Sequence, residues 1–412
     1  MTEQTWRIER LGHRGDGIAA GPVYVAGALP GELVTGRPEG ERLRDVRIVS
    51  PVAERVAPPC GHAGACGGCA LQHARDDFVG GWKMDVVRRA LADRGLAAPI
   101  AGLSVSPPSS RRRAVLHGRR TRKGALVGLM RRGTDALVAV PGCRVLRPGL
   151  LALVPALEDL TRAGASRSGV LDIALTETRG GIDVAVRGGK PLDRDLALAL
   201  AGWAAAAGVA RLSWDGETVV TLAPPVVDFA GIAVVPPPGA FLQATAEGEA
   251  ALRRAAVRAV GPAPRLADLF AGCGTFALPL AAGAAVHAVE GDAAMLAALG
   301  DGWRGGSGMK RVTTEARDLF RRPLEPEELA RFDAVVLDPP RSGAEAQCRR
   351  LASGGVPVIA MLSCNPASFA RDAAILAQGG YAIDWIEIVD QFRWSPHIEL
   401  AARLSLGHTA GD

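Results

Sequence analysis

Hydrophobic and polar positions alternate over short distances at the start of the chain. Short apolar runs of this kind occur at 23–25, 32–35 and 46–49, and glycines separate them. Short strands with frequent turn signals are typical of small barrels. We therefore predict a small β-barrel over residues 1–57.

The pattern is mixed in the middle of the chain. Residues 58–75 hold too many glycines for a helix, and a helix is predicted over residues 79–93. Strands are predicted at 170–175 and 182–186, joined by a hairpin turn, and an alanine-rich helix is predicted at 196–207. Residues 58–235 are thus predicted to form a central domain of mixed α+β class.

Strands and helices alternate in the last part of the chain, beyond a proline- and glycine-rich break at 236–239. Strands are predicted at 266–270, 285–290, 334–337 and 358–362. This alternation predicts an α/β domain over residues 236–412, with a parallel sheet covered by helices on both faces. In such sheets, ligands bind at the carboxyl ends of the strands.

Length and composition are those of a soluble protein with several domains. The chain has 412 residues, 48% hydrophobic and 22% charged, and this length predicts about two or three domains. It has no apolar run of about eighteen residues, and its polar N-terminus is unlike a signal peptide. We expect a cytoplasmic protein that does not contact membranes.

Positive charge is concentrated in one segment. The net charge is only +5, but residues 104–147 contain eleven basic residues against a single acid, Asp135. The basic residues are Arg111, Arg112, Arg113, Arg119, Arg120, Arg122, Lys123, Arg131, Arg132, Arg144 and Arg147. A solvated basic face is one interpretation; so large a local excess favours a surface that binds phosphates.

One predicted strand ends in a glycine-rich turn that opens a helix, in the segment Asp268–Phe276. Its glycines let the backbone approach a ligand closely, and acidic residues, Glu290, Asp318 and Asp338, end the following strands. A third glycine and a lysine are missing, which argues against a dinucleotide site and a P-loop. An ordinary turn with solvent-facing carboxylates is the alternative. The layout resembles the cofactor turn of the class I, Rossmann-like S-adenosylmethionine methyltransferases.

A cysteine follows the last strand predicted above, in the segment Ser363–Pro366. A free cysteine is usually a small buried hydrophobe. Beside a predicted cofactor turn, at a strand's carboxyl end and with Glu399 downstream, Cys364 is instead a candidate nucleophile. The segment Asp338–Arg341 resembles a motif of amino-group methyltransferases, which have an aromatic residue where this chain has Arg341, so amine methylation is disfavoured.

The motifs occur in the order that is seen in the RNA uracil-C5 methyltransferases, and the resemblance covers nearly the whole chain. They are Phe241–Gln243, Asp268–Phe276, Asp338–Arg341, Ser363–Pro366 with Arg371–Asp372, and His397–Glu399. The resemblance implies methyl transfer from S-adenosylmethionine to RNA, with Cys364 as nucleophile and Glu399 as general base. It also implies a set of cofactor-binding residues: Gln243, Phe270, Thr275, Glu290, Asp318 and Asp338.

The chemistry explains why these two residue types are needed. Uracil C5 is too weak a nucleophile to take a methyl group from a sulfonium unaided. A thiolate that adds to C6 makes C5 nucleophilic, and a base must then remove the C5 proton before the thiolate can leave. Cys364 and Glu399 suit these two roles. His397 is either a positioning residue or a core histidine.

Four more cysteines lie upstream: Cys60, Cys66, Cys69 and Cys143. Structural disulfides are not expected in the cytoplasm, and four thiolates suit either zinc or a [4Fe–4S] cluster. The three-plus-one spacing is unlike the paired doublets of zinc ribbons. The family resemblance implies the iron–sulfur cluster at these four cysteines, with a structural or RNA-positioning role.

The resemblance also implies a substrate class. Residues 1–57 resemble the TRAM module, an oligonucleotide-binding-type barrel, and barrel and cluster together resemble the enzymes that act on 23S ribosomal RNA. We expect a monomer that binds ribosomal RNA. The alternatives are the same reaction on transfer RNA, a non-catalytic RNA-binding protein, and a DNA or protein methyltransferase. Thr245, Thr275 and Ser368 differ from the family's usual asparagines and threonine.

Overall fold

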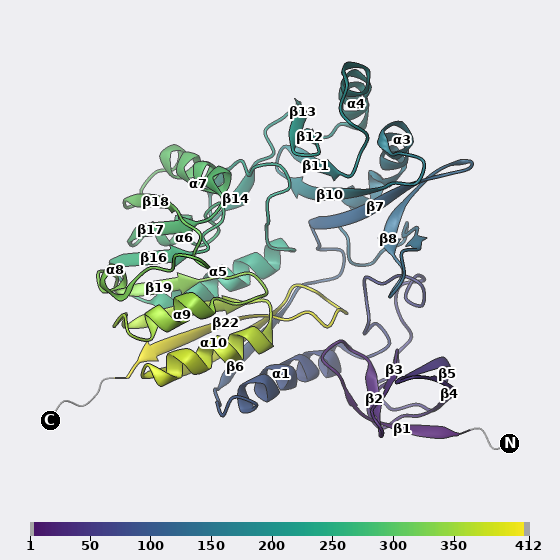
Figure 1. Cartoon of the computed structure of the whole chain (residues 1–412), viewed down its shortest axis with the longest axis horizontal. Coiled ribbons are helices and arrows are strands. Elements are labelled where there is room, and N and C mark those ends of the chain that lie inside the picture. The colour runs from purple at the N-terminus through teal and green to yellow at the C-terminus, as the bar shows by residue number, and fades with distance from the viewer. Residues whose placement is uncertain (1–3, 408–412) are drawn as a thin grey trace.

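The computed structural model describes residues 4–407, which form three sheet-based parts. Figure 1 shows a small N-terminal barrel at the lower right, a central sheet above it and a larger layered unit on the left. A two-stranded hairpin of β14 (Val227–Phe229) and β15 (Ile232–Val234) packs apolar side chains into the core of the layered unit. No helix in the described range is long and apolar enough to cross a membrane.

The barrel closes from five strands in the order β1-β2-β3-β5-β4. They are β1 (Thr5–Leu11), β2 (Gly17–Ala19), β3 (Val23–Val25), β4 (Leu33–Glu39) and β5 (Arg42–Ser50). Ile8, Val25 and Val34 point inward and are almost fully buried. Gly17 is required where β2 passes Ala28, because a Cβ at residue 17 would lie 2.9 Å from the Ala28 carbonyl oxygen. The predicted N-terminal β-barrel is confirmed.

The central part is a seven-stranded sheet in the order β13-β12-β11-β10-β7-β8-β9. Its elements are β7 (Arg113–Thr121), β8 (Gly124–Met130), β9 (Leu137–Val138), α2 (Pro148–Ala152), α3 (Val154–Gly164), β10 (Val170–Thr178), β11 (Gly181–Arg187), α4 (Arg194–Ala207), β12 (Arg211–Trp214) and β13 (Glu217–Thr221). Leu157 of α3 and Leu200 of α4 join the apolar core of the sheet. The predicted hairpin is present, with Thr178 paired to Gly181 at its turn.

The C-terminal unit is an eight-stranded sheet in the order β18-β17-β16-β19-β20-β22-β21-β6. Its strands are β6 (Ile100–Val105), β16 (Arg265–Leu269), β17 (Ala285–Glu290), β18 (Val312–Ala316), β19 (Ala334–Leu337), β20 (Val358–Ser363), β21 (Tyr381–Asp390) and β22 (Glu399–Leu406). The strands from β16 to β20 are parallel, as predicted. By contrast, β22 lies antiparallel between β20 and β21. The Rossmann-like α/β prediction is thus confirmed, with an antiparallel end.

Helices cover both faces of this sheet (Figure 1). They are α1 (Asp76–Ala92), α5 (Ala246–Val260), α6 (Ala277–Leu280), α7 (Ala293–Gly305), α8 (Pro326–Leu329), α9 (Glu345–Leu351) and α10 (Pro366–Gln378). Alternate residues of each strand serve the two cores: Leu266 faces the core with α5 and α7, and its neighbour Ala267 faces the core with α9 and α10. This period of two follows from strand geometry.

Two elements cross the predicted boundary between the central and the C-terminal domain. Strand β6 pairs in parallel with β21, and Val87 and Leu91 of α1 lie in the same core as Phe369 of α10. Both elements come from the range 58–235, which was assigned to the central domain. Hydrophobic spacing predicts that a helix or strand forms, but it does not identify the sheet against which the element packs.

Candidate active site

The carboxyl ends of the parallel strands surround a cavity of about 550 Å³. Seven of the eight residues predicted for catalysis and cofactor binding line it: Gln243, Phe270, Thr275, Glu290, Asp338, Cys364 and Glu399. The segment 237–241 that leads into α5 forms another wall, and Arg187 of the central sheet also reaches the cavity. The site therefore lies where an open α/β sheet usually binds ligands.

The glycine-rich turn after β16 forms the floor of this cavity. Phe270 and Gly274 both have positive φ, at 64° and 97°. A Cβ at Gly274 would lie 2.8 Å from Cγ of Leu278, so the helix that follows needs glycine there. The Gly272 amide donates a hydrogen bond to Glu290 Oε2 at 3.0 Å. This bond fixes the carboxylate at the end of β17, where it can accept further bonds from a ligand.

Asp318 is not among the residues that line the cavity. Its Oδ1 accepts hydrogen bonds from the amides of Phe320 and Arg321, at 3.0 and 3.3 Å, and shapes the loop after β18. Phe320 lines the cavity instead, with its ring centroid 5.3 Å from that of Phe270. The sequence did not identify Phe320, because a lone aromatic residue in a polar loop gives no periodic signal.

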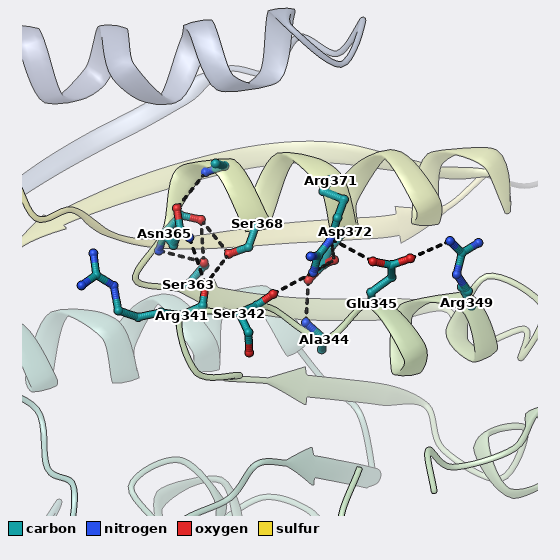
Figure 2. A network of polar contacts seen from close by, with 11 residues as sticks. Arg341, Ser342, Ala344, Glu345, Arg349, Ser363, Asn365, Ser368, Arg371 and Asp372 are labelled. Atoms are coloured by element: carbon teal, nitrogen blue, oxygen red, sulfur yellow. Dashed lines mark hydrogen bonds and ion pairs between the residues drawn. The ribbon is translucent and has the colours of Figure 1, made fainter. Parts of the chain in front are cut away.

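Cys364 follows the last residue of β20 and precedes α10, so the strand end positions its thiol at the cavity. Figure 2 shows how the residues around it are bound to the Asp338–Arg341 loop. Asn365 Nδ2 and Ser368 Oγ both donate hydrogen bonds to the Arg341 carbonyl, at 2.9 and 3.1 Å. Ser368, one of the departures from the family pattern, therefore still supplies a hydroxyl to this loop.

The same loop is held a second time, further along α10 (Figure 2). Asp372 Oδ2 accepts a hydrogen bond from the Ala344 amide at 2.7 Å, and Arg371 donates to the Ser342 carbonyl at 2.9 Å. The Arg371 guanidinium also pairs with Asp372 at 2.6 Å. These contacts explain the Arg371–Asp372 motif: it fixes the loop between β19 and α9 relative to the helix that follows the cysteine.

The electrostatics of the cavity bring the pKa values of two carboxyls near neutral pH and keep the Cys364 thiol protonated before a ligand binds. Burial raises the pKa of Cys364 to about 11, with added effects of Glu399 and Asp338 and an opposing effect of Arg341. Burial also raises the pKa of Glu399 to about 8 and that of Asp338 to about 7. A carboxylate whose pKa lies near the working pH is a more effective general base than one at its ordinary value.

A second, larger hollow of about 780 Å³ meets the cavity at Cys364, and we call it the basic groove. Cys364 and Arg341 line both spaces. The other polar and charged walls of the groove are Arg10, His13 and Arg14 of the barrel, Arg89 and Asp93 near the end of α1, and Asn365 and His397 beside the cavity. The sequence did not single out Arg10, Arg14 or Arg89, because they are distant from the motifs along the chain.

Several residues of the predicted basic segment are engaged by other parts of the protein. Arg112 pairs with Glu249, Arg147 with Glu177 and Arg132 with Asp16. Arg111 lies over the ring of Phe392, 5.5 Å from its centroid. Outside these contacts, the exposed basic residues of the segment are Arg120, Arg122, Lys123, Arg131 and Arg144. The local charge count overestimated the free positive surface, because the balancing acids come from distant parts of the chain.

The four upstream cysteines line one cavity of about 340 Å³. A Cβ at Gly67 would lie 2.8 Å from the Met130 carbonyl oxygen, so the tight course of this loop requires glycine. Burial and, to a smaller extent, the other three thiols raise the pKa of Cys69 to about 11. Within residues 4–407, no three His, Cys, Asp or Glu side chains are grouped closely enough to hold a single metal ion.

Thr245 and Thr275, the other two departures, have different surroundings. Thr275 lines the cavity. Thr245 is buried and caps α5: its Oγ1 accepts a hydrogen bond from the Gly248 amide at 2.9 Å and lies 2.7 Å from Ser106 Oγ. The Thr245 hydroxyl is thus used by protein groups, as is usual for an N-cap residue.

Comparisons with known proteins agree with this geometry. A family model described as tRNA (Uracil-5-)-methyltransferase matches residues 310–406. An uncharacterized RNA methyltransferase of Rhizobium meliloti is 44% identical over 98% of this chain and 100% of the relative. The 23S rRNA (uracil(1939)-C(5))-methyltransferase RlmD of Chromohalobacter salexigens is 36% identical over 95% of this chain and 87% of the relative.

One solved structure is similar over the full length. It is the tRNA (uracil-54, C5)-methyltransferase of Pyrococcus abyssi in complex with S-adenosyl-L-homocysteine, with a TM-score of 0.77 and 21% identity. The alignment covers 98% of this chain and 100% of that structure. At this identity the match supports the fold, including the small barrel and the Rossmann-like sheet.

Proposed function

The chain belongs to the RNA uracil-C5 methyltransferases, and on this premise we propose that it methylates a uridine of 23S ribosomal RNA through a covalent bond between Cys364 and uracil C6. Membership of the family makes it an S-adenosylmethionine-dependent enzyme that acts on uracil in RNA. The ribosomal substrate is supported by the 36% identical relative that carries this activity in its name. Methylation of transfer RNA is the other outcome.

The observation that carries the covalent proposal is the position of Cys364, on the shared wall of the basic groove and the cavity. An RNA strand bound in the groove would have to turn its target base out of the stack to reach the thiol. Gln243, Phe270, Thr275, Glu290 and Asp338 would hold the cofactor and the base on the cavity side, with Asp318 shaping the loop that carries Phe320.

The proposed steps balance as follows. The Cys364 thiol gives up its proton to solvent water in the groove, and its sulfur forms a bond to C6 while the C5=C6 electron pair moves through C4 onto the C4 carbonyl oxygen. The enolate electron pair then forms a bond from C5 to the methyl group that S-adenosylmethionine would supply, and the sulfur of the departing S-adenosylhomocysteine keeps the pair of the broken S–CH₃ bond. Glu399 then takes the C5 proton, the electron pair of that C–H bond restores C5=C6, and the C6–S bond breaks to release the thiolate. The raised pKa of Glu399, about 8, suits the acceptor of that proton.

Two variants and a substituted RNA test this mechanism. In RNA with 5-fluorouridine the proton is replaced by fluorine, which a base cannot remove, so the wild-type enzyme should form a stable adduct. Glu399→Gln should accumulate the adduct even on ordinary RNA, and Cys364→Ala should form none. Denaturing gel electrophoresis with labelled RNA measures all three. Methylation by the Cys364→Ala enzyme would disprove the covalent step. Mapping 5-methyluridine in RNA from a deletion strain would separate the ribosomal from the transfer RNA substrate.

We propose further that the four upstream cysteines hold a [4Fe–4S] cluster. The donor set fits, because four thiols from two segments, residues 60–69 and Cys143, line one cavity. A cluster keeps its ligands further apart than a single tetrahedral zinc ion, whose sulfurs lie about 2.3 Å from the metal. With four protein ligands the role would be structural. Anaerobically purified protein should be brown, with about four irons per chain. Colourless protein with one zinc per chain would contradict the proposal.

One chain supplies both walls of the basic groove, from the barrel and from the C-terminal sheet. We therefore propose that the enzyme acts as a monomer. Light scattering at assay concentration would measure this: a dimer that alone carries activity would contradict the proposal.

A further inference from the structure

A buried glutamine that belongs to none of the motifs connects two residues of the site. Gln391 follows the last residue of β21 and is 2% exposed. Its Nε2 donates a hydrogen bond to Gln243 Oε1 at 2.6 Å. Its side chain also acts as a donor toward the Glu399 carboxyl and lowers the pKa of that group. Gln391 therefore contacts a predicted ligand-binding residue and the predicted base through the same amide group.

The orientation of the Gln391 amide is fixed by the backbone. The amides of Ala244 and Thr245 donate to Gln391 Oε1 at 2.8 and 3.4 Å. Because a backbone N–H only donates, the oxygen of Gln391 must face α5 and its nitrogen must face Gln243 and Glu399. A Cβ at Gly248 would lie 2.7 Å from Cβ of Gln391, so α5 needs glycine at this position for Gln391 to pack against it.

This arrangement in turn fixes Gln243. The Gln243 oxygen accepts the bond from Gln391, so the Gln243 NH₂ group, for which no protein acceptor is found within residues 4–407, is the part that faces the cavity. An NH₂ group donates to a carbonyl oxygen but not to another amino group. The cavity wall is thus set to meet a carbonyl, which uracil carries at C4 and cytosine does not.

We propose that Gln391 is a positioning residue of the methyl transfer: it turns the Gln243 NH₂ group toward the base and holds a donor against the Glu399 carboxylate. This inference rests on the proposed function. Two charged groups face Glu399: Asp338, whose charge raises the pKa of Glu399, and Arg341, whose charge lowers it. The charge of Glu399 in turn raises the pKa of the Cys364 thiol. Gln391 acts in the same direction as Arg341, since a donor stabilises the ionised form.

Gln391→Met keeps the side-chain length and removes both polar atoms. We expect kcat on ordinary RNA to fall on the order of tenfold, and the acid limb of the kcat–pH profile to move to higher pH, because Glu399 loses a donor to its charged form. Adduct formation with 5-fluorouridine RNA at saturating RNA should fall less than kcat on ordinary RNA does, because adduct formation depends on the orientation of Gln243 but not on proton removal by Glu399. A defect in packing alone would lower kcat and adduct formation to the same extent and would not move the pH profile.

Gln347→Met is the matched control. Gln347 is also fully buried, but its side-chain amide bonds the backbone of Leu324, at 2.9 and 3.2 Å, and neither residue lines the cavity. This variant should lower the unfolding temperature and leave the pH profile unchanged. If Gln391→Met does not fold, Gln391→Glu carries the test. A carboxylate there only accepts, so Gln243 would turn its NH₂ group away from the base, and KM for RNA should rise.

The outcomes separate the two proposals. Suppose that the wild-type enzyme forms its adduct with 5-fluorouridine RNA. If Gln391→Met then has the kcat and the pH profile of the wild type, or if Gln391→Glu has an unchanged KM, the proposed role of Gln391 is wrong and the covalent mechanism stands. If the wild-type enzyme forms no adduct with 5-fluorouridine RNA, the covalent mechanism fails and the role of Gln391 fails with it.

Discussion

The pKa values of Glu399 and Asp338, about 8 and about 7, mean that both carboxyls keep a proton in the folded protein that they would lose in the unfolded chain. Each pKa is raised by burial first. A raised pKa of an acid contributes stability below the unfolded pKa, and this contribution is lost as pH rises through the folded pKa. The burial that makes the site's carboxyl a more effective base therefore also lowers the stability of the folded protein as the pH rises.

At the residue scale we predict that the protein loses stability as the pH rises, and that Glu399→Gln reduces this loss. The ordinary pKa of Glu399 is 4.5 and its folded value about 8, so the unfolding temperature of the wild-type protein should fall between about pH 5 and pH 8. Glutamine has no proton to lose, so the variant should fall less steeply over this interval. Calorimetry at constant ionic strength measures both curves, and parallel curves would contradict the pKa shift.

The positions of Cys364 and Glu399 at the cavity could be predicted from the sequence, Cys364 from its motif after a predicted strand and Glu399 from the family resemblance of its segment. Gln391 and Phe320 could not. Gln391 acts through Gln243, 148 residues away along the chain, and no local pattern encodes a contact of that kind. Asp318 shows the converse: its place at a strand end predicted a ligand contact, but its carboxylate is used by the amides of its own loop.

At the element scale, α1 shows how a buried ion pair connects two segments that are distant along the chain. Lys83 of α1 is completely buried, and its Nζ lies 2.7 Å from Asp390 Oδ1 at the end of β21. Lys83 also donates to the Phe392 carbonyl at 3.3 Å. The pair fixes the segment that begins with Gln391 against α1. The sequence predicted this helix as an element, but assigned it to the central domain, because a single lysine within a helix does not indicate its partner.

We predict that Lys83→Met destabilises the protein by about 3–5 kcal/mol, because it leaves the Asp390 carboxylate buried and unpaired. The double variant Lys83→Met with Asp390→Asn should recover part of this loss, since the asparagine oxygen can still accept the bond from the Phe392 amide. Urea unfolding measures the free energies. Arg88→Met, in an exposed pair with Asp85 on the same helix, should cost less than about 1 kcal/mol. Equal losses at residues 83 and 88 would contradict the argument.

At the scale of the whole molecule, the folded chain redistributes the charge that the sequence shows. The basic segment 104–147 predicts a phosphate-binding surface, but three of its eleven basic residues are paired with the acids Glu249, Glu177 and Asp16. The groove instead gathers single arginines from the barrel and α1 beside Arg341. Residues this far apart meet only after the three parts have assembled, so charge clustering along the chain cannot predict the groove.

We therefore predict that the barrel contributes to RNA binding through Arg10 and Arg14, which are exposed in the groove and make no ion pair within residues 4–407. Arg10→Gln and Arg14→Gln should each raise KM for RNA and reduce the slope of log K against log salt by about 0.7–0.9 for each phosphate that is no longer neutralised. At saturating RNA, kcat should stay near the wild-type value, because neither residue belongs to the cavity. Filter binding at several salt concentrations measures the slope. Arg304→Gln removes the same charge from α7, at the opposite end of the molecule (Figure 1), and should leave the slope unchanged. If Arg304→Gln reduced the slope as much as the groove variants do, RNA affinity would depend only on the net charge of the protein, and the groove would not be the RNA-binding site.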